Sequence, residues 1–355
     1  MKKTHICIIE FFALALSCFI GLMLYFLFTP VITQKEGASY YLRPGATKKI
    51  VAYDLSQQGI INHPMLLLLY AFPHKNYALK TGEYYFPKGS TPYSIWKQFR
   101  NGTGRLYHPF AVIPGWNFKQ LRAELLKTQG LRHTTAAFTD NQIMERLGYP
   151  NLSPEGEFFP DTYNYTRGDT DLGILKRAFN LMQIKLQKVW NSRASELPYQ
   201  NAYEALIAAS MIEKEGYLDK ERPLIAGVLI NRLKKGMLLQ IDATIIFGLG
   251  DRYDGKIYKQ NLREDTPYNT YLHKGLPPTP IAMPGLSSLQ AATHPQQNNF
   301  YYYVAKGNGS HEFSTTLQEH YDAVQSTVNQ QNGETIIPKP TENPVLPYHQ
   351  SLLTH

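Results

Sequence analysis

The first thirty residues contain one long apolar segment, from Ile6 to Phe28, which follows Lys2 and Lys3. A helix needs about 20 apolar residues to cross a hydrocarbon core of about 30 Å, whereas the apolar core of a cleavable signal peptide has only about 7–15. Glu10 is the single charged interruption and lies near the basic end. The pattern predicts a retained single-pass transmembrane helix at residues 6–28, with residues 1–5 in the cytoplasm and the rest of the chain outside it.

After this helix, one local pattern recurs: an extended stretch, a glycine, a capping residue two positions later and an aliphatic residue six positions later. The three sets are Gly45/Thr47/Val51, Gly89/Thr91/Ile95 and Gly115/Asn117/Leu121. Glycine suits a tight turn, and a Thr or Asn oxygen accepts hydrogen bonds from the free N–H groups at the start of a helix. The pattern predicts strand–turn–helix units that form a small α/β module over residues 39–130.

A helix is predicted from Ala202 to Glu215, because apolar positions recur at helical spacing and Gly216 follows as a terminating residue. At about 100° per residue, Glu204 and Glu215 share one face, which we expect to be solvated. Glu213 lies on the opposite face, among alanine, leucine and serine side chains. Burial without a partner favours the protonated form of a carboxyl group, which a general acid requires. Glu213 is therefore a candidate catalytic acid.

The alternative is that Glu213 is a structural residue paired with a buried arginine. Arg232 is the candidate partner, because it falls on the apolar stripe of the next predicted helix, from Pro223 to Gly236. Helical geometry alone leaves both interpretations open.

Polar groups are concentrated in the segments that follow. Residues 237–244 read as an extended stretch whose period-two alternation presents Gln240, Asp242 and Thr244 on one side. The later segments 266–271 and 275–281 are loops stiffened by proline and rich in amide, hydroxyl and phenol groups. Such loops suit a carbohydrate cleft, in which sugar rings stack and hydroxyls need fixed hydrogen-bonding partners.

The amino-acid composition narrows the classes of protein to which the chain can belong. The chain has 355 residues, 43% hydrophobic and 18% charged, which is globular and leaves room for two folded units. The net charge of +8 suits an anionic partner, but the basic residues are scattered, which argues against nucleic acid. Cys7 and Cys18 both lie in the apolar segment, so the globular part has no disulfide, thiol nucleophile or cysteine metal site. The proline-rich residues 331–355 are predicted to be a disordered tail.

Several short motifs occur in the order typical of the endolytic murein transglycosylase family, also called YceG-like, and the chain resembles that family from about residue 40 to 328. The motifs are Ala209-Ser210-Met211-Ile212-Glu213-Lys214-Glu215, Glu221-Arg222-Pro223, Asn231-Arg232-Leu233, Gly236-Met237, Leu239-Gln240, Pro267-Tyr268-Asn269-Thr270-Tyr271, Gly275-Leu276-Pro277-Pro278, Pro284-Gly285 and His311-Glu312-Phe313-Ser314. One departure is Ala243, where the family usually has proline between Asp242 and Thr244.

The resemblance implies a bacterial lytic transglycosylase that cleaves peptidoglycan between N-acetylmuramic acid (MurNAc) and N-acetylglucosamine (GlcNAc), leaving 1,6-anhydro-MurNAc ends and terminating or trimming nascent strands. It implies Glu213 as the single catalytic acid/base, with no metal or cofactor. The expected substrate-binding residues are Gln240, Asp242, Thr244, Tyr268, Asn269 and Arg232. The expected partners are glycan strands and peptidoglycan synthases, not nucleic acid.

The resemblance also completes the expected architecture, which is α+β. A transmembrane helix in the bacterial inner membrane precedes a small module similar to LysM, a fold associated with binding GlcNAc chains. A larger mixed α+β catalytic domain follows over residues 131–330. We expect the catalytic domain to lie in the periplasm.

Two other classes remain. A membrane-anchored peptidoglycan-binding scaffold without catalysis would fit the small module and the anchor. A zinc-dependent peptidoglycan peptidase or amidase is suggested by His273, His294, His311 and His320, although no spacing among them matches a helical zinc motif.

Overall fold

The computed structural model describes residues 2–72 and 78–332, which form two compact units. Unit 1 comprises residues 1–110, 128–134 and 164–171, and unit 2 comprises residues 111–127, 135–163 and the chain from residue 172 onward. The chain leaves unit 1 after residue 110, whereas the predicted module extends to residue 130, and two later segments return to unit 1. The second of these segments, residues 164–171, is hydrogen-bonded to unit 1, because the Glu83 N–H donates to Thr166 Oγ1 at 3.0 Å. The predicted tail lies outside the described residues.

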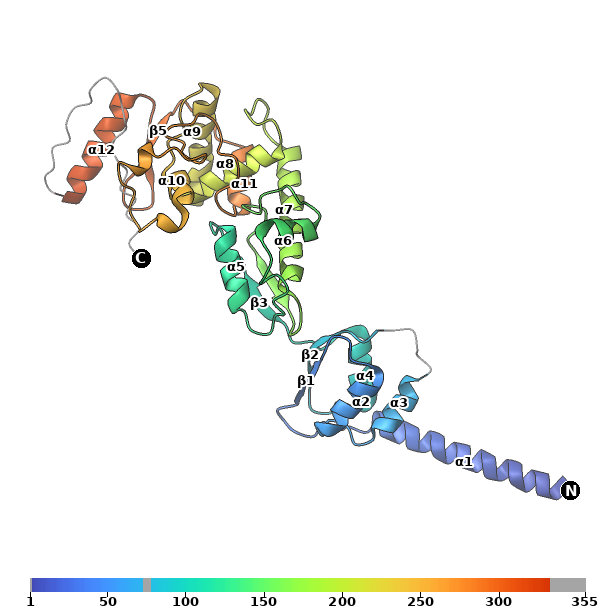
Figure 1. Ribbon diagram of the computed structural model, residues 1–355. Coiled ribbons are helices and arrows are strands. Elements are labelled where there is room, and N and C mark those ends of the chain that lie inside the picture. The colour runs from blue at the N-terminus through green and yellow to red at the C-terminus, as the bar shows by residue number, and fades with distance from the viewer. Residues whose placement is uncertain (1, 73–77, 333–355) are drawn as a thin grey trace. The chain divides into compact units, whose positions relative to one another are not determined.

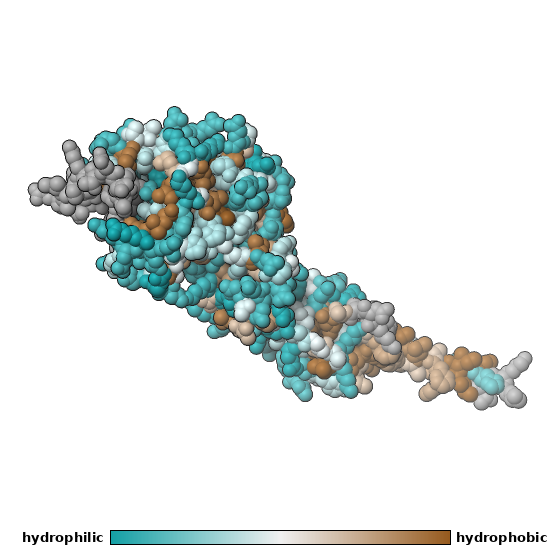
Figure 2. Space-filling model, turned by 45° about the horizontal axis from the view of Figure 1, so that its top comes forward, coloured by the Kyte–Doolittle hydropathy of each residue, from teal (hydrophilic) through white to brown (hydrophobic). Residues whose placement is uncertain are grey.

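The N-terminal helix α1 (Lys2–Phe28) has 27 residues, and its apolar part is long and apolar enough to cross a membrane. Figure 2 shows apolar surface along most of α1. The prediction of a single such helix is confirmed within the described residues. Its last turn is part of unit 1, because Phe26 and Leu27 are buried in the core of that unit.

Unit 1 continues with β1 (Ala38–Leu42), α2 (Lys48–Gln57), α3 (Pro64–Ala71), β2 (Gly82–Phe86) and α4 (Pro92–Asn101) (Figure 1). Strands β1 and β2 pair antiparallel, with Tyr40 opposite Tyr84. The aromatic side chains of Tyr84, Phe86 and Phe99 pack edge to face beneath them. This close aromatic packing supplies much of the core, because each aromatic ring buries a large apolar area.

The predicted strand–turn–helix pattern is confirmed at all three places. Gly45, Gly89 and Gly115 each have a positive φ, of 79°, 89° and 82°, which glycine adopts at little cost. Thr47 accepts from the Ile50 N–H, Thr91 from Ser94, and Asn117 from Gln120. The glycine turns the chain and the next side chain caps the helix, as the sequence predicts.

Unit 2 contains α5 (Phe118–Lys127), α6 (Asp140–Leu147), most of α7 (Asp171–Asn191), α8 (Ala202–Glu215), α9 (Arg222–Lys234), α10 (Asp242–Leu249), α11 (Leu286–Thr293), β5 (Tyr302–Ala305), β6 (His311–Ser314) and α12 (Leu317–Asn332). Strands β5 and β6 form an antiparallel hairpin. Strands β3 (His108–Ala111) and β4 (Thr162–Tyr165) form another two-stranded sheet, and the unit boundary passes through both. The α+β class is confirmed.

Helix α8 is the central element of unit 2 and packs against α9, α10 and α11 (Figure 1). Its boundaries are the predicted ones, with Asn201 capping the first turn through the Glu204 N–H. All residues from Ala205 to Ile212 are buried. Alanine occupies positions 205, 208 and 209, and such small side chains allow neighbouring helices to approach closely.

The prediction of an extended stretch over residues 237–244 is wrong at its end. Gln240 has a φ of 51°, and helix α10 starts at Asp242. The Thr244 N–H and hydroxyl both donate to the Ile241 carbonyl, at 3.1 and 2.7 Å, and so close the first turn. Asp242 and Thr244 therefore do not share the face of a strand, because the period-two alternation ends where the helix begins.

Candidate functional site

Glu213 is fully engaged in hydrogen bonds. Its side chain is 5% exposed and pairs with Arg222 through two contacts, of 3.1 and 3.2 Å. It also accepts from the Gly285 N–H at 2.9 Å and from Ser288 Oγ at 2.8 Å. Gly285 is the N-cap of α11, so Glu213 joins the starts of α9 and α11 to α8. Arg232 is therefore not its partner, and these contacts are those of a structural ion pair.

Glu215 lies in the opposite kind of surroundings from those predicted. The expectation that it faces solvent is wrong: the side chain is partly buried, and Tyr303 of β5 donates to its Oε2 at 3.2 Å. Burial, and next the negative charge of Asp242, raise the pKa of Glu215 to about 7. A carboxyl group with this pKa can both donate and accept a proton near neutral pH.

Asp242 is the second carboxyl group of this cluster. It begins α10, where the helix dipole favours a negative charge, and it accepts from the Tyr271 hydroxyl at 2.5 Å. Burial, and then the charge of Asp242, raise the pKa of Tyr271, so its hydroxyl keeps its proton and stays a donor. We define Glu215, Asp242, Tyr271 and Tyr303 as the acidic cluster.

Arg232 and Gln240 border the acidic cluster. Arg232 is buried and donates to the carbonyls of Tyr301 and Leu239, at 2.6 and 2.9 Å, and to Gln240 Oε1 at 3.3 Å. Burial lowers the pKa of its guanidinium group. Its bonds to main-chain oxygens tie β5, which carries Tyr303, to the segment that leads into Asp242. Arg232 thus positions this site.

Of the three other predicted binding residues, two are buried and one is partly accessible to solvent. Thr244 and Asn269 are 0% and 1% exposed. Thr244 bonds to Thr270, and the Asn269 amide donates to the carbonyls of Leu262 and Glu264. Both therefore stabilise loops, and direct contact with a substrate is sterically excluded for them in this conformation. Tyr268 is partly buried, and its hydroxyl lies 2.9 Å from Thr279 Oγ1.

The pairing of Glu221 with His311 was not predicted from the sequence. The Glu221 carboxylate accepts from the His311 N–H at 3.1 Å and lies 2.8 Å from His311 Nδ1, with both side chains about one tenth exposed. The His311 ring also contacts the Tyr303 ring edge to face, at 5.4 Å. The pair fixes the β5–β6 hairpin to the start of α9. Both residues lie in the quoted motifs, which is the signal that could have identified them.

Two further glutamates also have raised pKa values. Burial raises the pKa of Glu155 to about 7 and that of Glu157 to about 8. Glu155 accepts from the Phe118 N–H and so caps α5, and Glu157 is 1% exposed and accepts from Gln183. These contacts are structural, and they leave Glu215 as the better candidate for proton transfer.

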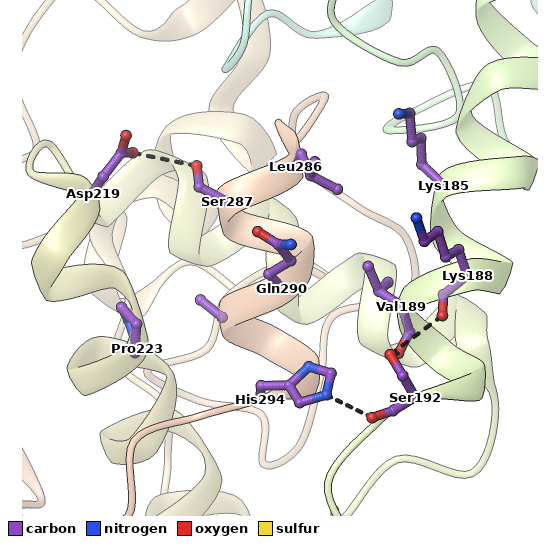
Figure 3. A pocket seen from close by; sticks show the side chains of 11 residues that line it. Lys185, Lys188, Val189, Ser192, Asp219, Pro223, Leu286, Ser287, Gln290 and His294 are labelled. Carbon is purple, nitrogen blue, oxygen red and sulfur yellow. Dashed lines mark hydrogen bonds between the residues drawn. The ribbon is translucent and has the colours of Figure 1, made fainter.

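A surface pocket of about 520 Å³ lies elsewhere, on the outer face of α11 (Figure 3). Lys185 and Lys188 from α7 and His294 after α11 line it. It contains none of the predicted site residues and no member of the acidic cluster. Within residues 2–72 and 78–332, no three His, Cys, Asp or Glu side chains gather as ligands for a metal ion.

Comparisons with known proteins agree on one family. A model of the YceG-like family matches residues 40–326. A Bacillus subtilis protein named endolytic murein transglycosylase is 38% identical over 84% of this chain and 87% of its own length. A Streptococcus pneumoniae protein of the same name is 25% identical over 81% of this chain, which spans 58% of that protein.

The fold has a counterpart of known structure. The crystal structure of a putative YceG-like protein from Listeria monocytogenes matches 81% of this chain and 99% of its own, with a TM-score of 0.52 and 24% identity. The family match covers most of the chain, including the acidic cluster. The chain therefore belongs to the YceG-like family.

Proposed function

We propose that the chain is an endolytic murein transglycosylase that cleaves MurNAc–GlcNAc bonds in peptidoglycan strands, with Glu215 as its acid/base. The observation that carries the assignment of Glu215 is its raised pKa, about 7, beside Asp242 and Tyr303. The name shared by the B. subtilis and S. pneumoniae relatives supports the reaction. Termination or trimming of nascent strands is the role that we propose for it.

In the proposed mechanism, protonated Glu215 donates to the glycosidic oxygen that leaves C1 of MurNAc, and positive charge develops on that sugar. The Glu215 carboxylate then accepts the proton of the C6 hydroxyl of the same sugar, whose oxygen bonds to C1. One C–O bond breaks, one forms, and the proton is passed on. The nucleophile is intramolecular, so its effective concentration is high without a bound water. Asp242, which accepts a hydrogen bond from Tyr271, lies beside Glu215 and stabilises the developing positive charge.

Glu213 remains the alternative acid/base, as predicted from its helical face. Four donor groups hold its carboxylate in the structure. To reach a glycosidic oxygen, this carboxyl group would have to give up some of these bonds. Matched variants of the two glutamates, described in the Discussion, decide between them.

The products distinguish the one-carboxyl mechanism from hydrolysis. If Asp242 activated a water, two carboxyl groups would act and the products would carry reducing ends. We expect 1,6-anhydro-MurNAc ends, lighter by one water, when purified glycan strands are digested and analysed by mass spectrometry. Reducing ends would contradict the transglycosylase mechanism, and no release of fragments would favour a binding scaffold. Activity lost on metal chelation would favour the zinc peptidase or amidase.

The pH dependence should report the Glu215–Tyr303 bond. The first step needs protonated Glu215, so kcat/KM should fall as pH rises through about 7. The bond from Tyr303 favours the carboxylate and lowers the pKa of Glu215, so Tyr303→Phe should raise that pKa and move the alkaline limb to higher pH. The pH profile of purified enzyme on glycan strands measures the shift. Tyr302→Phe is the neighbouring control, and an unmoved limb in Tyr303→Phe would refute the role of this bond.

We also propose that α1 anchors the protein in the inner membrane of a bacterium with its N-terminus in the cytoplasm, that the catalytic unit lies in the periplasm, and that the small module binds glycan as a LysM-like domain. The length and apolarity of α1 and the basic Lys2 and Lys3 support this orientation. Peptidoglycan synthases are the proposed protein partners. Protease added to spheroplasts should digest the globular part, and full protection would refute the orientation.

A further inference from the structure

The end of α1 is embedded in the small module. Phe26 and Leu27 are buried in the core of unit 1, and Met23 packs against that core. The Phe26 ring contacts the ring of His63, the N-cap of α3, at 6.2 Å. Helix α3 therefore starts beside the last turn of α1, within the same compact unit.

Helix α3 presents an apolar face outward. Its sequence is Pro-Met-Leu-Leu-Leu-Leu-Tyr-Ala, and only Leu67 and Ala71 are buried. Met65 is 65% exposed, Leu69 48% and Phe72, directly after the helix, 65%. These positions, i, i+4 and i+7, lie on one side of a helix. A water-soluble surface rarely gathers large apolar side chains in this way without a partner.

The apolar face extends onto α2. Ile50 is 44% exposed and Tyr53 39%, and the Tyr53 hydroxyl contacts the Met65 sulfur at 3.3 Å. We define Ile50, Tyr53, Met65, Leu69 and Phe72 as the apolar face. Exposed Lys49 precedes it. An apolar surface with an adjoining cation and a tyrosine hydroxyl fits the boundary between lipid headgroups and acyl chains.

The dimensions of α1 place the start of α3 near the level of the bilayer surface. The 24 residues from His5 to Phe28 span about 36 Å, which exceeds the hydrocarbon core of about 30 Å. Met23 lies about 7.5 Å below Phe28 along the axis, so the module contacts α1 down to about the edge of the hydrocarbon. Exposed Tyr25 and Phe28, with the Tyr93 ring tilted against that of Phe28 at 5.1 Å, form an aromatic group at the same level.

We propose that the apolar face rests in the surface of the lipid bilayer, so that α3 is a second, in-plane membrane contact beside α1. This inference rests on the membrane anchor in the proposed function and not on the catalytic assignment. Lipid is the occupant because α1 and α3 pack against each other within one unit, and α1 brings the bilayer to α3. The contact would fix the height and tilt of the small module above the membrane.

The test uses the full chain in vesicles of phosphatidylcholine and phosphatidylglycerol. Cys7→Ser and Cys18→Ser remove the native thiols, and a nitroxide spin label is attached to a single new cysteine in each of three variants: Leu69→Cys as the test, Leu16→Cys within α1, and Gln318→Cys on exposed α12 as the aqueous reference. Power saturation compares the collision rate with oxygen, which enters lipid, and with a water-soluble nickel chelate. Met65→Cys repeats the test at the most exposed position of α3.

We expect the oxygen-to-nickel accessibility ratio at Leu69 and Met65 to be several-fold above that at Gln318 and below that at Leu16. A ratio at Leu69 and Met65 equal to the Gln318 value, with Leu16 in lipid, overturns the proposal and leaves the anchor intact. An aqueous Leu16 overturns the anchor and the proposal together. Spin–spin broadening at Leu69 that disappears on dilution with unlabelled chain would show a second copy on this face, which also overturns it.

Discussion

Glu215→Gln is expected to lower turnover by about 10²–10⁴-fold, the usual cost of losing a general acid/base, while the protein remains folded. Glutamine keeps the shape of the side chain and can still accept from Tyr303, but it cannot deliver a proton to the leaving oxygen. Turnover is measured by the release of soluble fragments from purified glycan strands. Folding is checked by the thermal unfolding midpoint, which should stay near that of the wild type.

Glu204→Gln is the matched control for Glu215→Gln, because Glu204 lies at the other end of the same helix and bonds to the Gln200 N–H. It should leave turnover nearly unchanged. If Glu215→Gln keeps near-normal turnover and Glu213→Gln loses it without loss of stability, then Glu213 is the acid/base and the helical-face prediction holds.

Arg222→Met is expected to lower the free energy of unfolding by roughly 3–5 kcal/mol, because it leaves the Glu213 carboxylate buried without its ionic partner. The two side chains are 12% and 5% exposed, so solvent cannot replace the lost interaction. The Gly285 and Ser288 donors remain and offset part of the cost. Denaturant unfolding followed by far-ultraviolet circular dichroism measures the change.

The double variant with Glu213→Gln and Arg222→Met provides the control for this ion pair. It removes both charges, so it should be more stable than Arg222→Met alone, and the difference gives the coupling between the two residues. Additive effects would show that the pair is not structural. Arg252→Met breaks an exposed ion pair with Glu264 and should change stability far less.

The sequence predicted the local features of the fold well. The limits of α8, the three capped turns and the apolar helix α1 depend on neighbouring residues only, and the structure confirms them. The family resemblance was also confirmed, because its motifs are short and specific. The similarity of the small module to LysM, and the way the chain passes between the two units, depend on tertiary packing. Local sequence patterns do not predict such packing.

The surroundings predicted for Glu213 and Glu215 differ from those in the structure, for a physical reason. A helical projection orders residues by direction, but it does not show what later segments cover. Glu215 is covered by Tyr303, 88 residues further along the chain, and Glu213 is held by Arg222, which precedes the stripe on which Arg232 was found. Asp242 was predicted as a substrate-binding residue from a strand alternation, but it begins helix α10, and its charge helps to raise the pKa of Glu215.

The return of the chain to unit 1 sets an order for biosynthesis. Thr166 is 1% exposed and accepts a hydrogen bond from the Glu83 N–H. Arg132 and Thr170 form an isolated β-bridge between the two returning segments. The small unit, although it is synthesised first, therefore lacks part of its own structure until residue 171 has been synthesised. Until then, the backbone groups that these segments satisfy remain open to water, so unit 1 cannot complete its fold before the first segments of unit 2 have been made.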